Sequence, residues 1–475
     1  MEHTWQAGLR TQREECQGVE LDVEGSFPEW LEGTFISNGP GQFEIGDRTL
    51  EHWFDVLAML RAVRISDGTA RYTNRFVRSE DFTVAREEGR VRRGLPGTPA
   101  DGSPLGRLYG ALAGGFQDNP SIGVARLDGK LYAVTESPVG IEVDPDSLET
   151  VGRRDLTEGL DADVTLGHFH VEDGTQWGLA ASFGGESSYT LFRRPPGEPP
   201  KPVTRLVYDG QPPYVHAFAL TERYAVVPEM PFGVDFRRLL LGVPRGGTFL
   251  DAFARRDAPA RFRVLDRTTG ESVAAVPAEP FFVYHFANAY EDGDSVVVDC
   301  VRFDDETAIT GLRLANLRSD DPDLPRGDFV RYRLPLEGGR ADCELLCPGP
   351  VEFPTINYDR YNGRPYRYAY LAATDDGSLP TAIAKVDTDD RTTTRWSQPG
   401  LHPGEAIFVP APSPTGEDDG VLLSLALDTP ADRSVLLCLD AESLTERARA
   451  PLPHRLPYAF HGQFYEATAP TRSMA

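Results

Sequence analysis

The sequence predicts an all-β fold, and two features of the chain support this. Short segments in which apolar and polar residues alternate recur from end to end, as in VARLDGKLYAVTE at 124–136. Asp-Gly pairs, which favour tight hairpin turns, separate many of these segments, among them Asp67-Gly68, Asp128-Gly129 and Asp173-Gly174. A propeller of several four-stranded blades accommodates such hairpins best, and a pair of stacked sandwiches is the alternative.

No linker or low-complexity stretch divides the 475 residues, so we expect residues 1–475 to form a single domain. One segment departs from strand alternation. Between 231 and 256, large apolar residues stand beside arginines, and Phe232, Phe236, Leu239, Leu240, Phe249, Leu250 and Phe253 follow helical spacing. An apolar insertion of this kind either caps the core or touches a membrane surface, and the two roles are compatible.

The composition excludes some classes of partner. A formal net charge of −25 and a pI near 4.8 argue against nucleic acid, whose phosphates an acidic surface would repel. Lys130, Lys201 and Lys385 are the only lysines. Abundant acid with so little lysine resembles proteins of halophiles, and an ordinary acidic protein from a GC-rich genome is the alternative.

Five scattered cysteines form no disulfide framework and fit a reducing compartment. Two of them, Cys343 and Cys347, are interpreted as strand thiols. The chain begins without an apolar signal core, and no run approaches 18 apolar residues. We therefore expect a cytoplasmic protein that does not span a membrane.

Nine histidines are the main candidates for chemistry. We interpret His3, His402 and His454 as surface residues from their terminal or proline-flanked contexts. Four contexts are instead apolar or aromatic: GHFHVEDG, PPYVHAFALTERY, FFVYHFANAYED and PYAFHGQFY. Buried imidazoles need partners, and a metal at a propeller axis would satisfy four of them together. On the residues alone, zinc, iron, nickel and copper remain open.

Motifs along nearly the whole chain resemble those of the carotenoid cleavage oxygenases, which include animal β-carotene oxygenases and the vertebrate retinoid isomerase. The resemblance rests on their order and spacing: GTFISNGPGQFEIGD, HWFDVLAML, LYAVTESPVGIEVDPDSLETVG, VEFPTINYDRYNGRPYRYAY, PGEAIFVPAP and the terminal FHG. It implies a seven-bladed β-propeller with a helical or loop cap over the active-site face. Ser37 departs from the family pattern, which has arginine before Asn-Gly-Pro, and Val56 replaces a glycine.

The resemblance also implies a site. Its Fe(II) ligands would be His168, His216, His285 and His461, supported from behind by Glu136, Glu352 and Glu405. A carboxylate on the outer ring nitrogen fixes the tautomer of a metal-bound imidazole and makes it more basic. His170 shares a strand face with His168. We interpret it as a neighbour of the site and not as a ligand.

The implied reaction is scission of one C=C bond of a carotenoid or apocarotenoid by O₂, giving two carbonyl products. Symmetric cleavage of β-carotene to retinal is one hypothesis. The three lysines and Thr135 give little support to a stilbene-cleaving route. Candidate tunnel residues are Thr135, Phe169, Tyr214, Phe282, Tyr284 and Phe460.

Substrate extraction implies a peripheral membrane contact, through segments 231–256 and 104–116, which lie where relatives carry membrane-facing patches. Two alternatives remain open for the activity. One is a retinoid isomerohydrolase-like enzyme, and the other is a non-catalytic carotenoid-binding propeller.

Overall fold

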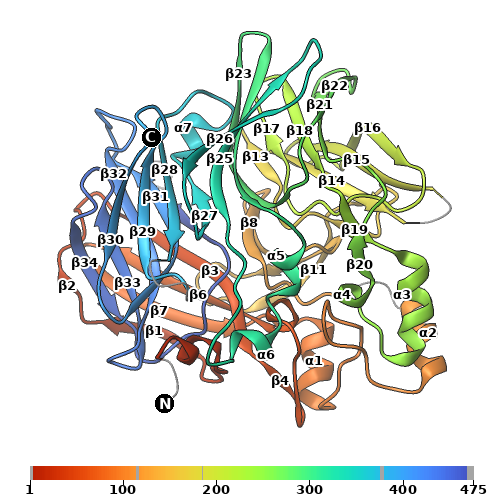
Figure 1. The fold of residues 1–475 in the computed structure, drawn as a ribbon. Coiled ribbons are helices and arrows are strands. Elements are labelled where there is room, and N and C mark those ends of the chain that lie inside the picture. Colours follow the sequence, from red (N-terminus) through yellow and green to blue (C-terminus); the bar gives the residue numbers. More distant parts are fainter. Residues whose placement is uncertain (1–3, 114–116, 184–185, 375–378, 468–475) are drawn as a thin grey trace, which may run out of the picture.

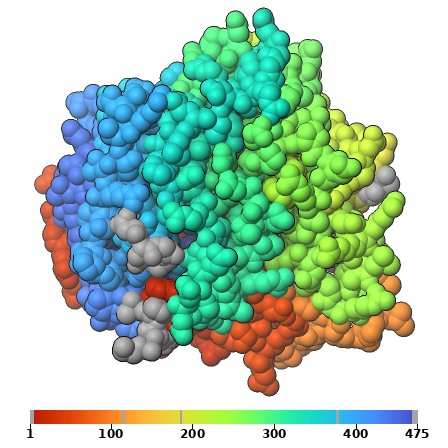
Figure 2. All heavy atoms as spheres, viewed as in Figure 1, coloured from red at the N-terminus to blue at the C-terminus, as the bar shows by residue number. Residues whose placement is uncertain are grey.

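Seven β-sheets form the blades of a propeller around a central axis (Figure 1). The computed structural model describes residues 4–113, 117–183, 186–374 and 379–467. Colours that follow one another in the sequence also adjoin on the space-filling surface, because consecutive blades are neighbours in the ring (Figure 2). The predicted all-β propeller is confirmed, and the stacked-sandwich alternative is wrong.

The first three blades come from the first half of the chain. Blade one orders its strands as β1 (Cys16–Leu21), β7 (Thr69–Phe76), β6 (Leu57–Ser66), β3 (Gly33–Gln42) and β35 (Gly462–Glu466). Blade two contains β11 (Thr150–Asp155), β10 (Val139–Val143), β9 (Lys130–Val134) and β8 (Gly123–Leu127). Blade three contains β12 (Val164–Thr165) and β13 (His170–Glu172), both paired with β14 (Thr175–Ser182), followed by β15 (Ser187–Arg194) and β16 (Lys201–Tyr208).

Four further blades complete the ring. Blade four contains β17 (Ala219–Leu220), β18 (Tyr224–Glu229), β21 (Arg261–Asp266) and β22 (Ser272–Pro277). Blade five contains β23 (Phe282–Asp292), β24 (Ser295–Phe303), β25 (Asp328–Pro335) and β26 (Asp342–Cys347). Blade six contains β27 (Val351–Thr355), β28 (Tyr368–Ala373), β29 (Ala382–Asp387) and β30 (Thr392–Ser397). Blade seven contains β31 (Leu401–Pro410), β32 (Gly420–Asp428), β33 (Arg433–Asp440), β34 (Glu446–Pro451) and β2 (Glu24–Gly25).

Strands from both ends of the chain close the ring. The N-terminal β2 pairs with β34 in blade seven, while the C-terminal β35 pairs with β3 in blade one. Each of these blades therefore contains strands from both ends, which removes an open seam from the propeller.

The Asp-Gly pairs form the tight turns that the sequence predicts. At Asp67-Gly68 the two φ angles are 49° and 72°, and at Asp128-Gly129 they are 52° and 75°. Positive φ at both central residues defines the type I′ turn, which matches the twist of antiparallel strands. β8 and β9 accordingly form the hairpin predicted at 124–136.

The two departures from the family motifs are buried in blade one. Ser37 lies directly opposite Arg61 of β6. The guanidinium of Arg61 is fully buried and donates to the carbonyl of Pro40. An arginine side chain is thus present next to position 37, but it comes from the neighbouring strand β6. Val56 is fully buried, and its carbonyl accepts a hydrogen bond from Asn119 at 2.6 Å.

Helices α1, α2, α3, α4 and α6 gather in the lower part of Figure 1, while α7 lies near the top. The described helices are α1 (Glu80–Glu87), α2 (Pro104–Ala113), α3 (Phe236–Gly242), α4 (Phe249–Ala252), α5 (Thr307–Thr310), α6 (Leu314–Leu317), α7 (Tyr358–Tyr361) and the 3₁₀ turns η1 (Thr4–Leu9), η2 (Trp53–Asp55) and η3 (Val243–Arg245). In the described part of the chain, none has the length and apolarity to cross a membrane.

The insertion at 231–256 is partly helical. It contains α3, η3 and α4 between two short paired strands, β19 (Phe232–Val234) and β20 (Phe253–Arg255). Phe232 and Phe253 are therefore strand residues, and helical spacing was the wrong interpretation for them. Both are buried, which explains why they resembled the inner face of a helix.

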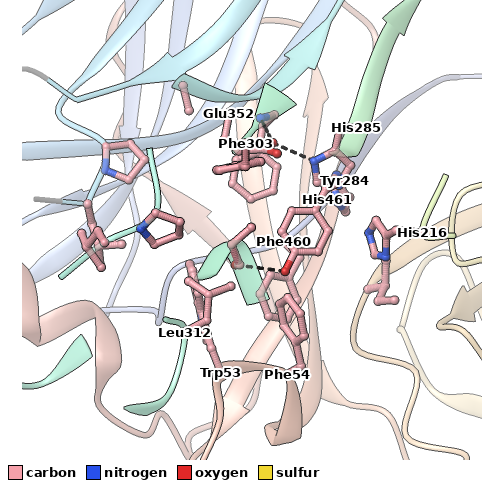
Figure 3. Close-up of a pocket in the computed structure, with 18 of the residues that line it drawn as sticks. Trp53, Phe54, His216, Tyr284, His285, Phe303, Leu312, Glu352, Phe460 and His461 are labelled. Carbon is pink, nitrogen blue, oxygen red and sulfur yellow. Dashed lines mark hydrogen bonds and ion pairs between the residues drawn. The ribbon is translucent and has the colours of Figure 1, made fainter. Parts of the chain in front are cut away.

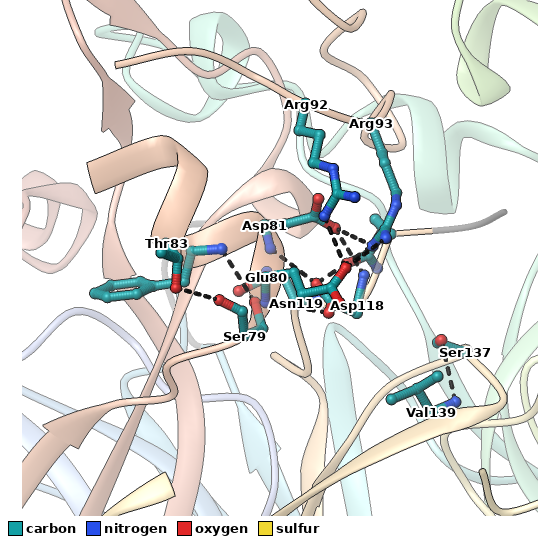
Figure 4. Close-up of polar contacts among 12 residues, drawn as sticks. Ser79, Glu80, Asp81, Thr83, Arg92, Arg93, Asp118, Asn119, Ser137 and Val139 are labelled. Carbon is teal, nitrogen blue, oxygen red and sulfur yellow. Dashed lines mark hydrogen bonds and ion pairs between the residues drawn. The ribbon is translucent and has the colours of Figure 1, made fainter. Parts of the chain in front are cut away.

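A network of charges anchors α1 to the segment that follows α2 (Figure 4). The carboxylate of Asp118 accepts the backbone N–H groups of Glu80 and Asp81 at 3.1 and 3.0 Å, at the start of the helix. Asp81 in turn accepts the backbone N–H of Asp118 at 2.8 Å, and Arg93 pairs with Asp81 at 3.1 Å. These bonds fix both ends of the excursion that carries α2.

Candidate metal centre

The seven residues predicted for the site come from seven different blades. In blade order they are His461 just before β35, Glu136 just after β9, His168 between β12 and β13, His216 just before β17, His285 in β23, Glu352 in β27 and Glu405 in β31. Side chains at the inner ends of propeller blades converge on the axis. This geometry explains how residues more than 300 positions apart meet.

The structure brings the four histidine rings together. The ring centroid of His168 lies 4.3 Å from that of His461, 4.7 Å from that of His216 and 4.8 Å from that of His285. The ligand nitrogens of His168, His285 and His461 all lie within 4.8 Å of one another. His216 stands outside this group of three, with its ring centroid 5.3 Å from that of His285.

Three of the histidines donate from Nδ1 to a glutamate. The distances are 2.6 Å for His216 and Glu136, 2.7 Å for His285 and Glu352, and 2.9 Å for His461 and Glu405. A carboxylate in this position holds the proton on Nδ1 and leaves the lone pair of Nε2 free to bind a metal.

The inner nitrogens fit a metal ion. Nε2 of His168 and Nε2 of His285 are buried and have no hydrogen-bond partner among the described residues. Burial, together with the neighbouring histidines, holds the pKa of both rings well below the usual value, so both are neutral. Neutral imidazoles without a polar partner are costly in a protein interior, and a first-row metal ion would satisfy them.

An apolar cavity of about 400 Å³ opens beside the histidines (Figure 3). Of the predicted tunnel residues, Thr135, Tyr214, Tyr284 and Phe460 line it. Phe169 and Phe282 do not. Phe169 packs against the small core cluster of blade two that contains Tyr132. Phe282 is fully buried behind Tyr214 and Tyr284, at centroid distances of 6.1 and 4.8 Å. Phe169 follows His168 in the irregular stretch between β12 and β13, outside both strands.

The sequence did not single out several other lining residues. Trp53 and Phe54 come from η2, Phe303 ends β24, and Leu312 lies between α5 and α6 (Figure 3). The first two fall inside the quoted HWFD motif, so a signal existed for them. His52 and Asp55 hold this turn: Nδ1 of His52 accepts the Phe54 N–H at 3.1 Å, and Asp55 accepts the His52 N–H at 3.0 Å.

Of the remaining histidines, His170 uses both ring nitrogens in hydrogen bonds to protein groups and is not available as a ligand. The surface interpretation was wrong for His402, which is buried in β31 beside the carbonyl of Pro380 at 3.1 Å. His454 is half-buried and bonds to Tyr72 at 3.1 Å. His3 lies outside the described residues.

Comparison with known proteins decides the family. The model of the RPE65 family, described as retinal pigment epithelial membrane protein, matches residues 9–466. The chain belongs to this family.

Relatives in the RPE65 family carry oxygenase names. A carotenoid isomerooxygenase of Galleria mellonella is 32% identical, over 96% of this chain and 95% of the relative. A chloroplastic carotenoid cleavage dioxygenase 8 homolog B of Oryza sativa subsp. japonica is 35% identical, over 93% of this chain and 81% of the relative. A solved variant of the Synechocystis apocarotenoid oxygenase matches with a TM-score of 0.87 and 27% identity, covering 98% of both chains. Together these relatives support an oxygenase.

Proposed function

We propose that the chain is an Fe(II)-dependent oxygenase that cleaves a C=C bond of a carotenoid or apocarotenoid with O₂ and releases two carbonyl products. The observation that carries the proposal is the group of four histidines beside an apolar cavity, two of which, His168 and His285, have a buried Nε2 without a partner among the described residues. The names of the relatives support the choice of substrate class.

His168, His216, His285 and His461 would hold the iron. When bound, Fe(II) supplies the activation of O₂ next to the alkene. Glu136, Glu352 and Glu405 keep a proton on Nδ1 of three of these rings, so that each Nε2 stays a neutral donor. Because none of the four ligands carries a charge, the glutamates also offset the charge of a divalent ion.

Aromatic side chains orient the substrate. Phe54, Tyr284, Phe303 and Phe460 line the cavity on the side of the histidines (Figure 3). The hydroxyl of Tyr284 is bonded to the carbonyl of Ala308 at 3.1 Å, so the residue presents its ring and not a free hydroxyl to the cavity. Apolar walls of this kind bind a polyene and exclude water.

We also propose that α2 and α3 contact a membrane to collect the substrate. Leu105, Tyr109 and Leu112 are exposed by 80, 73 and 67%, and their spacing places them on one face of α2. Leu241 of α3 is 70% exposed. Pro96 and Gln117, which flank the excursion carrying α2, line the cavity. A cytoplasmic protein of a halophile, bound peripherally to the membrane, fits this surface and the net charge of −25.

Metal analysis tests the proposal. The purified protein should bind one Fe(II) under anaerobic reconstitution, and His216→Ala and His461→Ala should lose most of it. If the wild-type protein binds no iron, the alternative of a non-catalytic carotenoid-binding propeller would be favoured. An iron-loaded protein that converts a retinyl ester into a rearranged retinol, and leaves carotenoids intact, would instead favour the isomerohydrolase alternative.

A further inference from the structure

His168 differs from the other three histidines of the centre. His216, His285 and His461 each bond to a glutamate through Nδ1. Among the described residues, no side chain hydrogen-bonds either ring nitrogen of His168. The orientation of the His168 imidazole must therefore be determined by something other than a carboxylate.

The backbone at His168 is irregular. β12 and β13 both pair with β14, and Thr165 lies opposite Ala180 while His170 lies opposite Trp177. Four residues, 166–169, thus face the two residues 178 and 179. A bulge of this kind re-aims a side chain but leaves its backbone outside the regular ladder. His170 is the first residue that returns to register.

The side chain of His170 is tied at both ends. Its Nε2 donates to the carbonyl of Phe218 at 2.9 Å, and its Nδ1 accepts the hydroxyl of Tyr358 at 2.7 Å. The neutral ring with its proton on Nε2 satisfies both bonds, because a carbonyl can only accept. Phe218 lies two residues after His216, and Tyr358 begins α7, which follows β27 of blade six.

We propose that His170 is the positioning residue for His168. It replaces the missing glutamate by pinning the end of the bulge to the segment of His216 on one side and to α7 on the other. The bond to Phe218 couples the positions of two ligand-bearing segments, whose His168 and His216 ring centroids are 4.7 Å apart. This inference rests on the proposed iron centre.

The test measures Fe(II) release to the chelator ferrozine from the anaerobically loaded protein. Loss of the groups that orient a metal ligand weakens metal binding by about 10- to 100-fold. We expect His170→Phe to release iron at least about tenfold faster than the wild type. His170→Gln, which keeps an N–H for Phe218, should restore most of the retention. Tyr358→Phe, which removes one hydroxyl from a partly exposed ring, should give a smaller acceleration.

A matched pair of controls exists in the same chain. Tyr72 and His454 form another tyrosine–histidine hydrogen bond, at 3.1 Å, without contact to the four candidate ligands. Tyr72→Phe and His454→Phe should leave iron release unchanged. X-ray absorption at the iron edge gives a second readout, and His170→Phe should show fewer imidazole ligands than the wild type.

Folded His170→Phe and Tyr358→Phe proteins that retain iron as the wild type does would overturn the inference and leave the proposed function intact. If His170→Phe does not fold, unchanged release from Tyr358→Phe overturns it alone. A wild-type protein that binds no iron would overturn both proposals.

Discussion

Glu352 accepts a hydrogen bond from Nδ1 of His285 at 2.7 Å, and the two residues lie on the innermost strands of adjacent blades. The bond joins β27 to β23 across the gap between blades six and five. It therefore orients a candidate ligand by a contact that exists only when these two neighbouring blades pack together.

Removing this carboxylate should weaken metal binding. We expect Glu352→Ala to lower Fe(II) affinity by about 10- to 100-fold, because His285 loses the group that fixes its tautomer. Glu352→Gln keeps an acceptor without the charge and should lose less. Competition with a chelator measures both. The exposed Glu271 provides a control, and equal affinities in Glu352→Ala and Glu271→Ala would contradict the role of Glu352.

Phe282 and Phe303 are paired on the neighbouring strands β23 and β24 and should differ in function. Phe303 lines the cavity, whereas its partner Phe282 is core. We expect Phe303→Leu to change KM or the position of cleavage, because it enlarges the space next to the polyene. Phe282→Leu should lower the free energy of unfolding by about 1 kcal/mol and leave the products unchanged. Chromatography of the products and chemical denaturation distinguish the two, and identical product patterns would argue against the assigned cavity wall.

Charges on α2 should reduce membrane binding. Burying three apolar side chains contributes several kcal/mol, so Leu105→Glu, Tyr109→Glu and Leu112→Glu combined should lower vesicle affinity by more than about tenfold. Flotation with liposomes measures this. Val151 and Val207 are also exposed, by 61 and 49%, but belong to blades two and three. Their glutamate variants should still float, and a loss of binding equal to that of the α2 variant would point to non-specific adsorption.

The turn that carries Trp53 and Phe54 should respond to pH in two opposing ways. Burial lowers the pKa of His52 to about 4. As the pH falls below the ordinary pKa of histidine, the unfolded chain is protonated at this residue before the folded protein is, so acid destabilises the fold. Burial raises the pKa of Asp55 to about 6, so the folded carboxyl takes up a proton before the unfolded one, and acid stabilises the fold.

Replacing His52 should make the acid stabilisation caused by Asp55 measurable. Relative to the wild type, His52→Gln should gain up to about 3 kcal/mol of unfolding free energy as the pH falls from 7 to 4, because the variant lacks the acid destabilisation that His52 causes while the Asp55 effect is common to both. Denaturation at a series of pH values measures the difference. Parallel profiles for the two proteins would contradict the lowered pKa of His52.

Salt should stabilise the protein if the acidic surface is an adaptation to it. A net charge of −25 opposes the compact state, and ions screen that repulsion. We expect Tm to rise as KCl increases from 0.1 M to about 2 M. A Tm that is highest at low salt would contradict the halophile proposal.

The sequence reveals the fold and the polar part of the site more readily than the walls of the cavity. Asp-Gly turns are local, so the hairpins can be predicted from neighbouring residues. The histidines and glutamates are recognisable because few other reasons exist to place such groups among apolar residues. Phe169 was predicted to line the cavity and does not, whereas Phe303 was not predicted and does. Which aromatic ring faces the cavity depends on the bulge at 166–169 and on packing between blades, and neither is visible in a local pattern.

Product analysis under ¹⁸O₂ is the decisive experiment for the proposed cleavage of a C=C bond. The iron-loaded protein is incubated with β-carotene, or with an apocarotenal, and the products are identified by mass spectrometry. We expect two carbonyl fragments of complementary length, both labelled, and no products from His285→Ala. Intact substrate after incubation with a fully iron-loaded wild-type protein would contradict it.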